Sequence, residues 1–262
     1  MNNVNKTLYI PLYGKSFVSK KGILLHDKTA ESIWEKEGFP LKGKSKSKWL
    51  AYYMGMRAAV FDEWLRNELT KDPESIVLHI GCGMDSRVER VGIHNHQWYD
   101  IDFPDVIKER RNYFKESKIY HLIPSDVRNR SWIEAIPAHK KALVVMEGIS
   151  MYLKPDELIK LLSDLNQHCM SVQILMDCYT ECGAKASRYK NPINDVGVTE
   201  VYGMDEPKVL EADTGLAFIK EHNMTPNSMI DQLKGLEKTI FQCLFGGKIA
   251  RGMYRMFEYK SK

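Results

Sequence analysis

Short apolar strand patterns alternate with amphipathic helix patterns in the middle of the chain, and this alternation constrains the fold more than any other feature. Buried-strand patterns occupy residues 75–80, 97–102, 120–124, 142–146 and 173–177. One helix pattern begins at Pro104, and another runs from residue 156 to residue 170. Strands that alternate with helices form parallel sheets, so the sequence predicts an α/β fold with helices on both faces of the sheet.

Two further strand patterns, residues 216–224 and 253–259, are joined by a helical stretch at 228–244. Because a full helix does not separate every pair of strands, one late strand is expected to lie antiparallel at the edge. The first 70 residues are mostly helical in pattern, and four of their side chains are spaced to pack on the sheet: Ala58, Phe61, Trp64 and Leu65. The prediction is a Rossmann-like, mostly parallel seven-stranded sheet whose functional end is capped by N-terminal helices.

Composition excludes several classes of protein. With 262 residues, 44% hydrophobic and 27% charged, the chain can bury a substantial core and is neither disordered nor fibrous. A formal net charge of +4 is too weak to demand a nucleic acid or a membrane as partner. The chain starts without the pattern of a signal peptide, and no apolar run approaches the roughly 18 residues that span a bilayer. We therefore expect a cytoplasmic protein.

The cysteines and lysines add two weaker expectations. Five cysteines, odd in number and scattered, predict reduced thiols rather than a disulfide framework. Cys178 and Cys182 lack a second pair at zinc spacing, so no metal site is expected. Residues 42–48 contain four lysines, and a solvated loop is the favoured interpretation. The other interpretation is a segment that contacts phosphate or gates a substrate.

A glycine turn follows the first predicted strand, at the sheet edge where open parallel sheets bind ligands. The missing β-carbons of Gly81 and Gly83 let a ligand approach the backbone, although a tight turn needs glycine for steric reasons alone. Asp102 ends the second strand, 19 residues past Gly83, at the separation typical of a carboxylate that binds a ribose. Ser86 replaces the third glycine of the dinucleotide fingerprint, which argues against a nicotinamide-dependent oxidoreductase. A nucleoside ligand is the better interpretation.

Acidic residues follow the third and fourth strands as well. Asp126 and Glu147, together with Asp85 and Asp102, place four acids around one pocket. Carboxylates this close repel one another, so the site needs cations from the protein or from its ligand. S-adenosylmethionine carries a sulfonium, an ammonium and a carboxylate. Two cations of the predicted cap are candidates to bind that carboxylate, namely Arg57 and Lys15.

Several blocks of sequence, taken together, point to a known family. They are residues 9–15 (YIPLYGK), 27–30 (DKTA), 77–87 (VLHIGCGMDSR), 98–107 (WYDIDFPDVI), 131–133 (SWI) and 146–153 (MEGISMYL), with Arg57 and Asp62. These blocks resemble the leucine carboxyl methyltransferase family, and most closely its bacterial small-molecule branch, the tetracenomycin polyketide O-methyltransferases. The resemblance implies a Rossmann-like class I methyltransferase fold, S-adenosylmethionine as cofactor and a small-molecule acceptor.

The resemblance also implies roles for individual residues. Asp102 would hold the ribose hydroxyls, and Asp126 with the Val127 backbone would meet the adenine. Glu147 would lie near the amino group, Arg57 would pair with the methionine carboxylate, and Lys15 stands where the family often has an arginine doing related work. The predicted cofactor-binding residues are Lys15, Arg57, Gly81, Cys82, Gly83, Asp102, Phe103, Asp126, Val127, Glu147 and Gly148.

Residues 1–262 are expected to form one methyltransferase domain. Its predicted parts are a helical cap or lid at 1–70, a cofactor-binding core at 71–178, and an acceptor-side insertion with the last strands at 179–262. Residues 181–213 have little periodicity and are expected to wall the acceptor pocket.

The predicted function is methyl transfer to a carboxyl or hydroxyl oxygen of a small molecule, with secondary metabolites as one acceptor class. A carboxylate needs no general base at neutral pH, whereas a phenol with a pKa of about 10 benefits from one. Tyr152 is the candidate catalytic residue that orients the acceptor oxygen, and packing is its other interpretation. Three alternatives stay open: a non-catalytic S-adenosylmethionine-binding protein, a nicotinamide-dependent oxidoreductase, and a methyltransferase of RNA or protein, for which the lysine-rich segment is the support.

Overall fold

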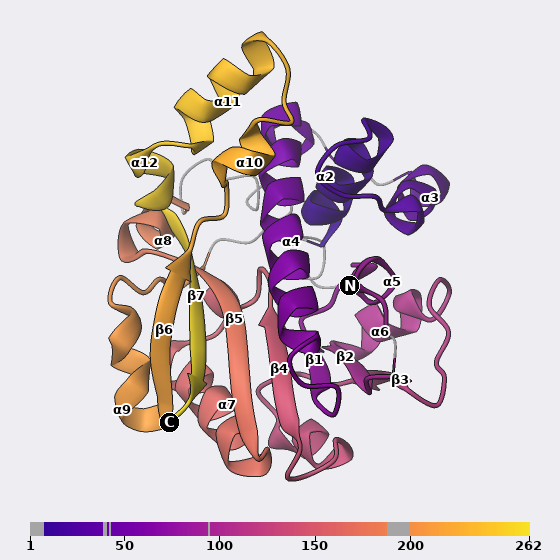
Figure 1. The fold of residues 1–262 in the computed structure, drawn as a ribbon, viewed down its shortest axis with the longest axis vertical. Coiled ribbons are helices and arrows are strands. Elements are labelled where there is room, and N and C mark those ends of the chain that lie inside the picture. Colours follow the sequence, from indigo (N-terminus) through magenta and orange to yellow (C-terminus); the bar gives the residue numbers. More distant parts are fainter. Residues whose placement is uncertain (1–7, 39–40, 42, 94, 188–199) are drawn as a thin grey trace.

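In the described part of the chain, strands form one seven-stranded sheet in the order β3-β2-β1-β4-β5-β7-β6 (Figure 1). The computed structural model describes residues 8–38, 41, 43–93, 95–187 and 200–262. The strands are β1 (Ile76–Ile80), β2 (Trp98–Asp102), β3 (Tyr120–Pro124), β4 (Lys141–Met146), β5 (Ser171–Tyr179), β6 (Leu216–His222) and β7 (Tyr254–Ser261). Neighbouring strands from β1 to β5 pair in parallel, which confirms the predicted α/β sheet.

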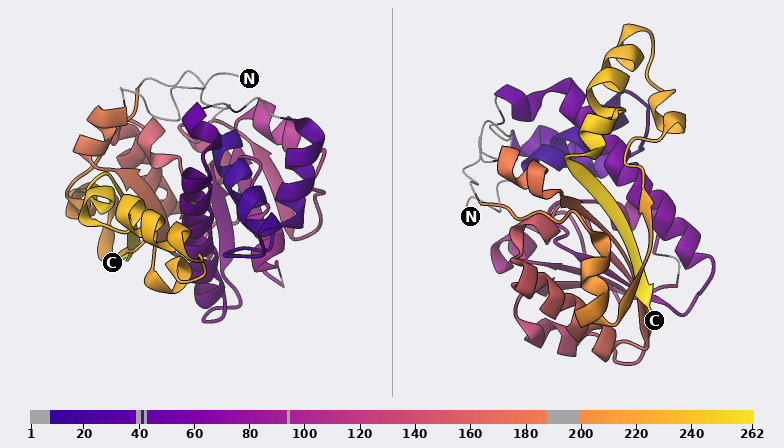
Figure 2. Two further views of the ribbon diagram at one scale, coloured as in Figure 1. Left: turned by 90° about the horizontal axis from the view of Figure 1, so that it is seen from above. Right: turned by 90° about the vertical axis from the view of Figure 1, so that its left-hand side faces the viewer.

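Helices cover both faces of this sheet (Figures 1 and 2). The helices are α2 (Tyr9–Lys20), α3 (Lys28–Glu37), α4 (Lys48–Leu69), α5 (Arg87–Val91), α6 (Pro104–Arg110), α7 (Pro155–His168), α8 (Glu181–Ser187), α9 (Glu211–Thr214), α10 (Asn227–Ile230), α11 (Leu236–Phe245) and α12 (Lys248–Arg251). Short 3-10 helices are η1 (Gly43–Lys46), η2 (Arg130–Ala135), η3 (Ser150–Tyr152) and η5 (Pro207–Leu210). None of the described helices combines the length and apolar character that a membrane-spanning helix needs.

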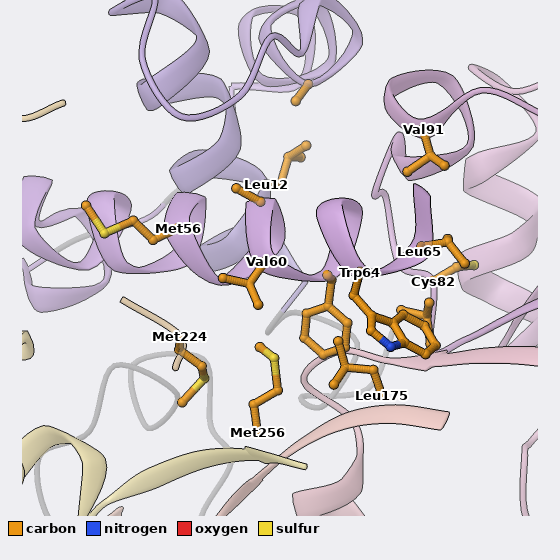
Figure 3. Packing of buried hydrophobic residues seen from close by; sticks show 14 of the residues in the cluster. Leu12, Met56, Val60, Trp64, Leu65, Cys82, Val91, Leu175, Met224 and Met256 are labelled. Carbon is orange, nitrogen blue, oxygen red and sulfur yellow. The ribbon is translucent and has the colours of Figure 1, made fainter. Parts of the chain in front are cut away.

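The central strands are buried on both faces, as parallel strands between helices must be. In β1 all five residues are buried: Val77 belongs to the core on the α4 face, whereas Ile76 and Leu78 belong to the core on the α7 face. Figure 3 shows the first of these cores, in which Val60 and Trp64 of α4 point toward Leu175 of β5 and Met256 of β7. Helix α4 is thereby fixed across the sheet, and α2 packs on its other side.

The last part of the chain differs from the prediction in one detail. The stretch at 228–244 is wrong as a single helix, because Gly235 between α10 and α11 has a φ of 54°, outside the right-handed helical region. The antiparallel strand is β7, which pairs with β5 on one side and with β6 on the other. The prediction of a late antiparallel strand at this edge of the sheet is confirmed, because β6 is outermost and its pairing with β7 is antiparallel.

Candidate active site

A cavity of about 890 Å³ lies at the carboxyl ends of the parallel strands. The first helices of the chain contribute to its wall, as do the turns that follow β1, β2, β3 and β4. All twelve residues that the sequence predicts for cofactor binding and catalysis line this one cavity: Lys15, Arg57, Gly81, Cys82, Gly83, Asp102, Phe103, Asp126, Val127, Glu147, Gly148 and Tyr152.

The turn after β1 depends on glycine. Gly81 has a φ of 70° and Gly83 a φ of 51°, in the left-handed region that L side chains rarely adopt. A β-carbon on Gly81 would also lie 2.7 Å from the Cδ1 atom of Ile149. Glycine is therefore required at this turn both by the backbone conformation and by packing. Without side chains, the backbone of the turn itself lines the cavity.

Asp102, at the end of β2, is held by the same turn. Its Oδ2 accepts a hydrogen bond from the Gly83 amide at 2.7 Å, and its Oδ1 accepts one from the Phe103 amide at 2.7 Å. Burial raises the pKa of the Asp102 carboxyl to about 6, although the two amide donors favour its ionised form. The two amides thus fix the orientation of the carboxylate.

Glu147, which follows β4, lies among three cations. Its carboxylate accepts a hydrogen bond from Arg57 at 2.9 Å and another from Arg87, and the Nζ atom of Lys15 lies 3.6 Å away. Burial alone would raise the pKa of Glu147, but Lys15, Arg57 and Arg87 together hold this pKa well below its usual range. Glu147 therefore stays ionised at neutral pH.

Asp85 is the second acid of this network. Its Oδ2 lies 2.8 Å from Lys15 Nζ and 3.3 Å from Arg87 Nη2, and its Oδ1 accepts a hydrogen bond from Arg90 at 2.7 Å. Burial opposes ionisation, yet the cations, Arg90 foremost, hold the pKa of Asp85 well below its usual range. Cations of the protein thus supply most of the charge compensation that the sequence requires.

The structure adds Asp177 and Tyr254, which sequence reasoning missed. Arg57 Nη1 donates a hydrogen bond to the Tyr254 hydroxyl at 2.9 Å and lies 3.2 Å from Asp177 Oδ2. Asp177 also accepts the amide of Gly148 at 2.7 Å, which connects β5 to the turn after β4. Burial raises the pKa of the Asp177 carboxyl to about 6, although Arg57 beside it works in the opposite direction. An acid at the end of a predicted strand is the signal that could have identified Asp177.

Asp126 does not join this network. It pairs with Arg128, two residues away, in an exposed salt bridge, and Arg128 lowers the pKa of its carboxyl. The carbonyl of the neighbouring Val127 accepts a hydrogen bond from Trp132 at 3.2 Å. Both residues still line the cavity, at the end that is reached from β3.

Aromatic side chains form part of the cavity wall beside Arg57. Tyr179 and Tyr254 have ring centroids 4.8 Å apart, and those of Tyr53 and Phe245 are 5.0 Å apart. The described residues of the segment 181–213 contribute none of the cavity lining, so the prediction that they wall the pocket is wrong for them. Residues 188–199 of that segment lie outside the described residues. Helices α4, α11 and α12 and strand β7 take this place.

These residues fit the nucleoside that the sequence predicts. Each oxygen of Asp102 accepts one hydrogen bond from the described residues and so retains a lone pair for a hydroxyl donor. Four cations (Lys15, Arg57, Arg87, Arg90) face five carboxylates (Asp27, Asp62, Asp85, Glu147, Asp177), an excess of acid that favours a cationic ligand. The described residues contain no group of three His, Cys, Asp or Glu side chains placed to hold a metal ion.

Comparison with known proteins identifies the family. A family model described as leucine carboxyl methyltransferase matches residues 3–166. The chain belongs to this family. Membership confirms the predicted enzyme class, a methyltransferase, with S-adenosylmethionine as the methyl donor that it implies. It leaves no ground for the nicotinamide-dependent alternative.

Two relatives of this chain are methyltransferases by name, and the name of the first places it in polyketide synthesis. The tetracenomycin polyketide synthesis O-methyltransferase TcmP of Streptomyces glaucescens is 26% identical over 92% of this chain and 90% of its own length. The S-adenosyl-L-methionine-dependent methyltransferase dpfgK of Gibberella zeae is 27% identical over 64% of this chain and 61% of its own length.

A solved structure of another methyltransferase shares the fold of this chain. Magnesium protoporphyrin IX methyltransferase from Synechocystis PCC 6803, solved with bound S-adenosylhomocysteine, has a TM-score of 0.52 and 10% sequence identity. The match covers 98% of this chain and 100% of that one. At this identity the likeness concerns the fold alone, and it confirms the predicted Rossmann-like class I methyltransferase fold.

Proposed function

We propose that the protein transfers the methyl group of S-adenosylmethionine to a carboxyl or hydroxyl oxygen of a small molecule, with secondary metabolites as the acceptor class. The observation that carries this proposal is the single cavity that gathers Gly83, Asp102 and Glu147 from three strand ends with Arg57 from α4. The name of one relative, a polyketide O-methyltransferase, favours methylation of an oxygen atom of a small molecule, and the second relative is by name an S-adenosyl-L-methionine-dependent methyltransferase. In this proposal residues 1–70 act as the cap, residues 71–178 bind the cofactor, and residues 179–262 contribute the acceptor side.

The cofactor-binding roles proposed for individual residues follow the geometry. Asp102, fixed by the Gly83 and Phe103 amides, accepts hydrogen bonds from the ribose hydroxyls. Asp126 and Val127, at the end reached from β3, lie by the adenine. Glu147 and Asp85 attract the positively charged part of the ligand, and Arg57 and Lys15 share their donors between these acids and the ligand carboxylate. The remaining residues of the set, Gly81, Cys82 and Gly148, form the backbone surface against which the cofactor packs.

Catalysis by this chain consists mainly of positioning. When bound, S-adenosylmethionine supplies a methyl group on a positively charged sulfur. The cavity wall must hold the acceptor oxygen about 3–3.5 Å from the carbon that it attacks. The aromatic side chains of Tyr53, Tyr179 and Tyr254 exclude water from that side and orient a flat or apolar acceptor. Tyr152, which lines the same cavity, is proposed to orient the acceptor oxygen.

Binding of S-adenosylhomocysteine tests the cofactor site. Calorimetric titration is expected to give one site per chain in the wild type and at least tenfold weaker binding in Asp102→Ala, since a lost hydrogen bond to a charged group costs about 1.5–3 kcal/mol. Absence of binding to the wild type, or unchanged affinity in Asp102→Ala, would reject the proposal.

Turnover separates the enzyme from a binding protein without catalysis. Release of S-adenosylhomocysteine is measured against a panel of organic acids and phenols, with each methylated product identified by mass spectrometry. Methyl ester or methyl ether formation on the acceptor oxygen supports the proposal. Methylation of nitrogen or carbon in the same panel would contradict the assignment of an O-methyltransferase.

A further inference from the structure

Helix α11 carries a row of exposed apolar side chains that the proposed function does not use. Leu236, Ile240 and Leu244 are 79%, 41% and 53% exposed, and they are half of the large apolar side chains that are exposed in the described part of the chain. Since they are four residues apart, they lie along one side of the helix. Single exposed apolar residues are common, but an aligned row calls for an explanation.

The row is not the side of α11 that attaches the helix to the protein. Phe241 is fully buried, with its ring centroid 6.1 Å from that of Tyr52 in α4. Glu237 accepts hydrogen bonds from Tyr52 at 2.6 Å and from Lys48 at 2.8 Å. These contacts attach α11 to α4 through the side of α11 that carries Glu237 and Phe241. The apolar row does not take part in this attachment.

The row leads into the candidate active site. Leu244 is a member of the row and also lines the cavity, as does the next residue, Phe245. Trp49, Leu50 and Met54 of α4 also line this cavity. The stretch from Leu236 to Leu244 rises about 12 Å along the helix axis. An apolar strip of this length therefore runs from the outer end of α11 to the cavity.

We propose that this strip, the α11 row (Leu236, Ile240, Leu244), binds the apolar tail of an elongated methyl acceptor whose reacting oxygen lies in the cavity. This inference rests on the proposed function and names its acceptor class, a long-chain acid or phenol. Continuity of the row with the cavity through Leu244 favours this occupant. A second copy of the chain is a less suitable occupant. Each partner of a stable interface buries about 800 Å², and the surface area of three side chains is far smaller.

Chain length in the acceptor is the variable that tests the α11 row. Calorimetric titrations in saturating S-adenosylhomocysteine compare hexanoate with dodecanoate, and para-hexylphenol with para-dodecylphenol. Each methylene that becomes buried improves affinity by about fourfold. We therefore expect the longer compound to bind at least tenfold tighter than the shorter one in one of the two pairs. If this is the acid pair, the reacting group of the acceptor is a carboxyl; if it is the phenol pair, the reacting group is a hydroxyl.

Variants of exposed residues then locate the tail. Leu236→Asp and Ile240→Asp are expected to weaken binding of the longer acceptor at least tenfold while the affinity for S-adenosylhomocysteine is unchanged. Gln242→Asp is the control, because it places the same charge on another exposed side of α11. Equal loss in Gln242→Asp, or no loss in the row variants, would overturn the inference.

The remaining outcomes are distinguishable as well. Normal S-adenosylhomocysteine binding without any preference for chain length overturns the α11 row alone, whereas absence of S-adenosylhomocysteine binding overturns the proposed function. Sedimentation velocity of the wild type and Ile240→Asp gives the oligomeric state. A dimer that Ile240→Asp dissociates would overturn the inference in favour of a second copy of the chain on the row.

Discussion

Arg57, in α4, donates a hydrogen bond of 2.9 Å to Glu147, which follows β4 and lies 90 residues further along the chain. Both side chains are buried, and Lys15 and Arg87 approach the same carboxylate. This contact joins the N-terminal helices to the strand ends, so the charge network that forms the candidate site also helps to hold the cap on the sheet.

Removal of the Glu147 charge is expected to destabilise the fold. Glu147→Gln removes the carboxylate that Lys15, Arg57 and Arg87 share. Breaking a buried ion pair by removal of one partner costs up to about 3–5 kcal/mol of unfolding free energy, and the carboxylates of Asp85, Asp177 and Asp62 that stay beside these cations reduce this cost. Urea denaturation measures the change. The matched control is Asp126→Asn, whose exposed pair with Arg128 is worth about 1 kcal/mol or less. Equal stability losses in the two variants would contradict the role of the buried network.

A pair of glycines tests the turn after β1. Gly22 and Gly81 have φ values of 68° and 70°, but a β-carbon would meet Ile149 at Gly81 and nothing within 4 Å at Gly22. Both alanine variants carry the left-handed backbone penalty of about 1–2 kcal/mol. Gly81→Ala is expected to lose about 1–3 kcal/mol more because of overpacking. Thermal or urea unfolding compares them, and equal losses would show that Ile149 moves aside without cost.

The affinity for S-adenosylhomocysteine should depend on pH through Asp102. Burial raises the pKa of this carboxyl to about 6, and the ribose hydroxyls need the ionised form as acceptor. Affinity should be constant above about pH 7 and fall about tenfold per pH unit once the pH is below the pKa. Calorimetry between about pH 5 and 8 measures it.

Asp102→Asn is the control for this titration, since an amide does not ionise in the range. Its affinity should be low and nearly independent of pH. An unchanged pH profile in Asp102→Asn would assign the titration to another group, and Asp177, whose pKa burial also raises to about 6, is the first to test.

Tyr152 is predicted to act on the acceptor and not on the cofactor. Removal of its hydroxyl in Tyr152→Phe should lower kcat for a methylated acceptor by about tenfold, the loss of one oriented hydrogen bond, and leave the affinity for S-adenosylhomocysteine unchanged. Steady-state kinetics and calorimetry check the two parts separately. A normal kcat in Tyr152→Phe would show that Tyr152 serves only to pack η3.

Local sequence patterns account for most of the sheet and for half of the site's chemistry. Apolar runs ended by glycine or acid located the strands and their carboxyl ends, so Gly81, Gly83 and Asp102 could be predicted as neighbours. The same rule applied to residue 177 would have included Asp177. Tyr254 could not be predicted in this way, because it starts an antiparallel strand 197 residues from its partner Arg57.

Two cations of the site, Arg87 and Arg90, were not predicted from the sequence for a different reason. Arg87 and Arg90 lie in the short helix α5 beside Ser86 and Glu89, and charged residues in such a segment are typically solvated. Both side chains are buried in the structure because Asp62 of α4 pairs with Arg87 at 2.8 Å and with Arg90 at 2.6 Å. The burial of these arginines is therefore decided by a tertiary contact, which sequence periodicity does not contain.

A crystal structure of the protein with S-adenosylhomocysteine shows where the cofactor binds. We expect one ligand per chain in the cavity at the strand ends, with its ribose hydroxyls on Asp102 and its amino-acid carboxylate beside Arg57 or Lys15. Ligand density at any other place, with this cavity left unfilled, would rule out the proposed cofactor site.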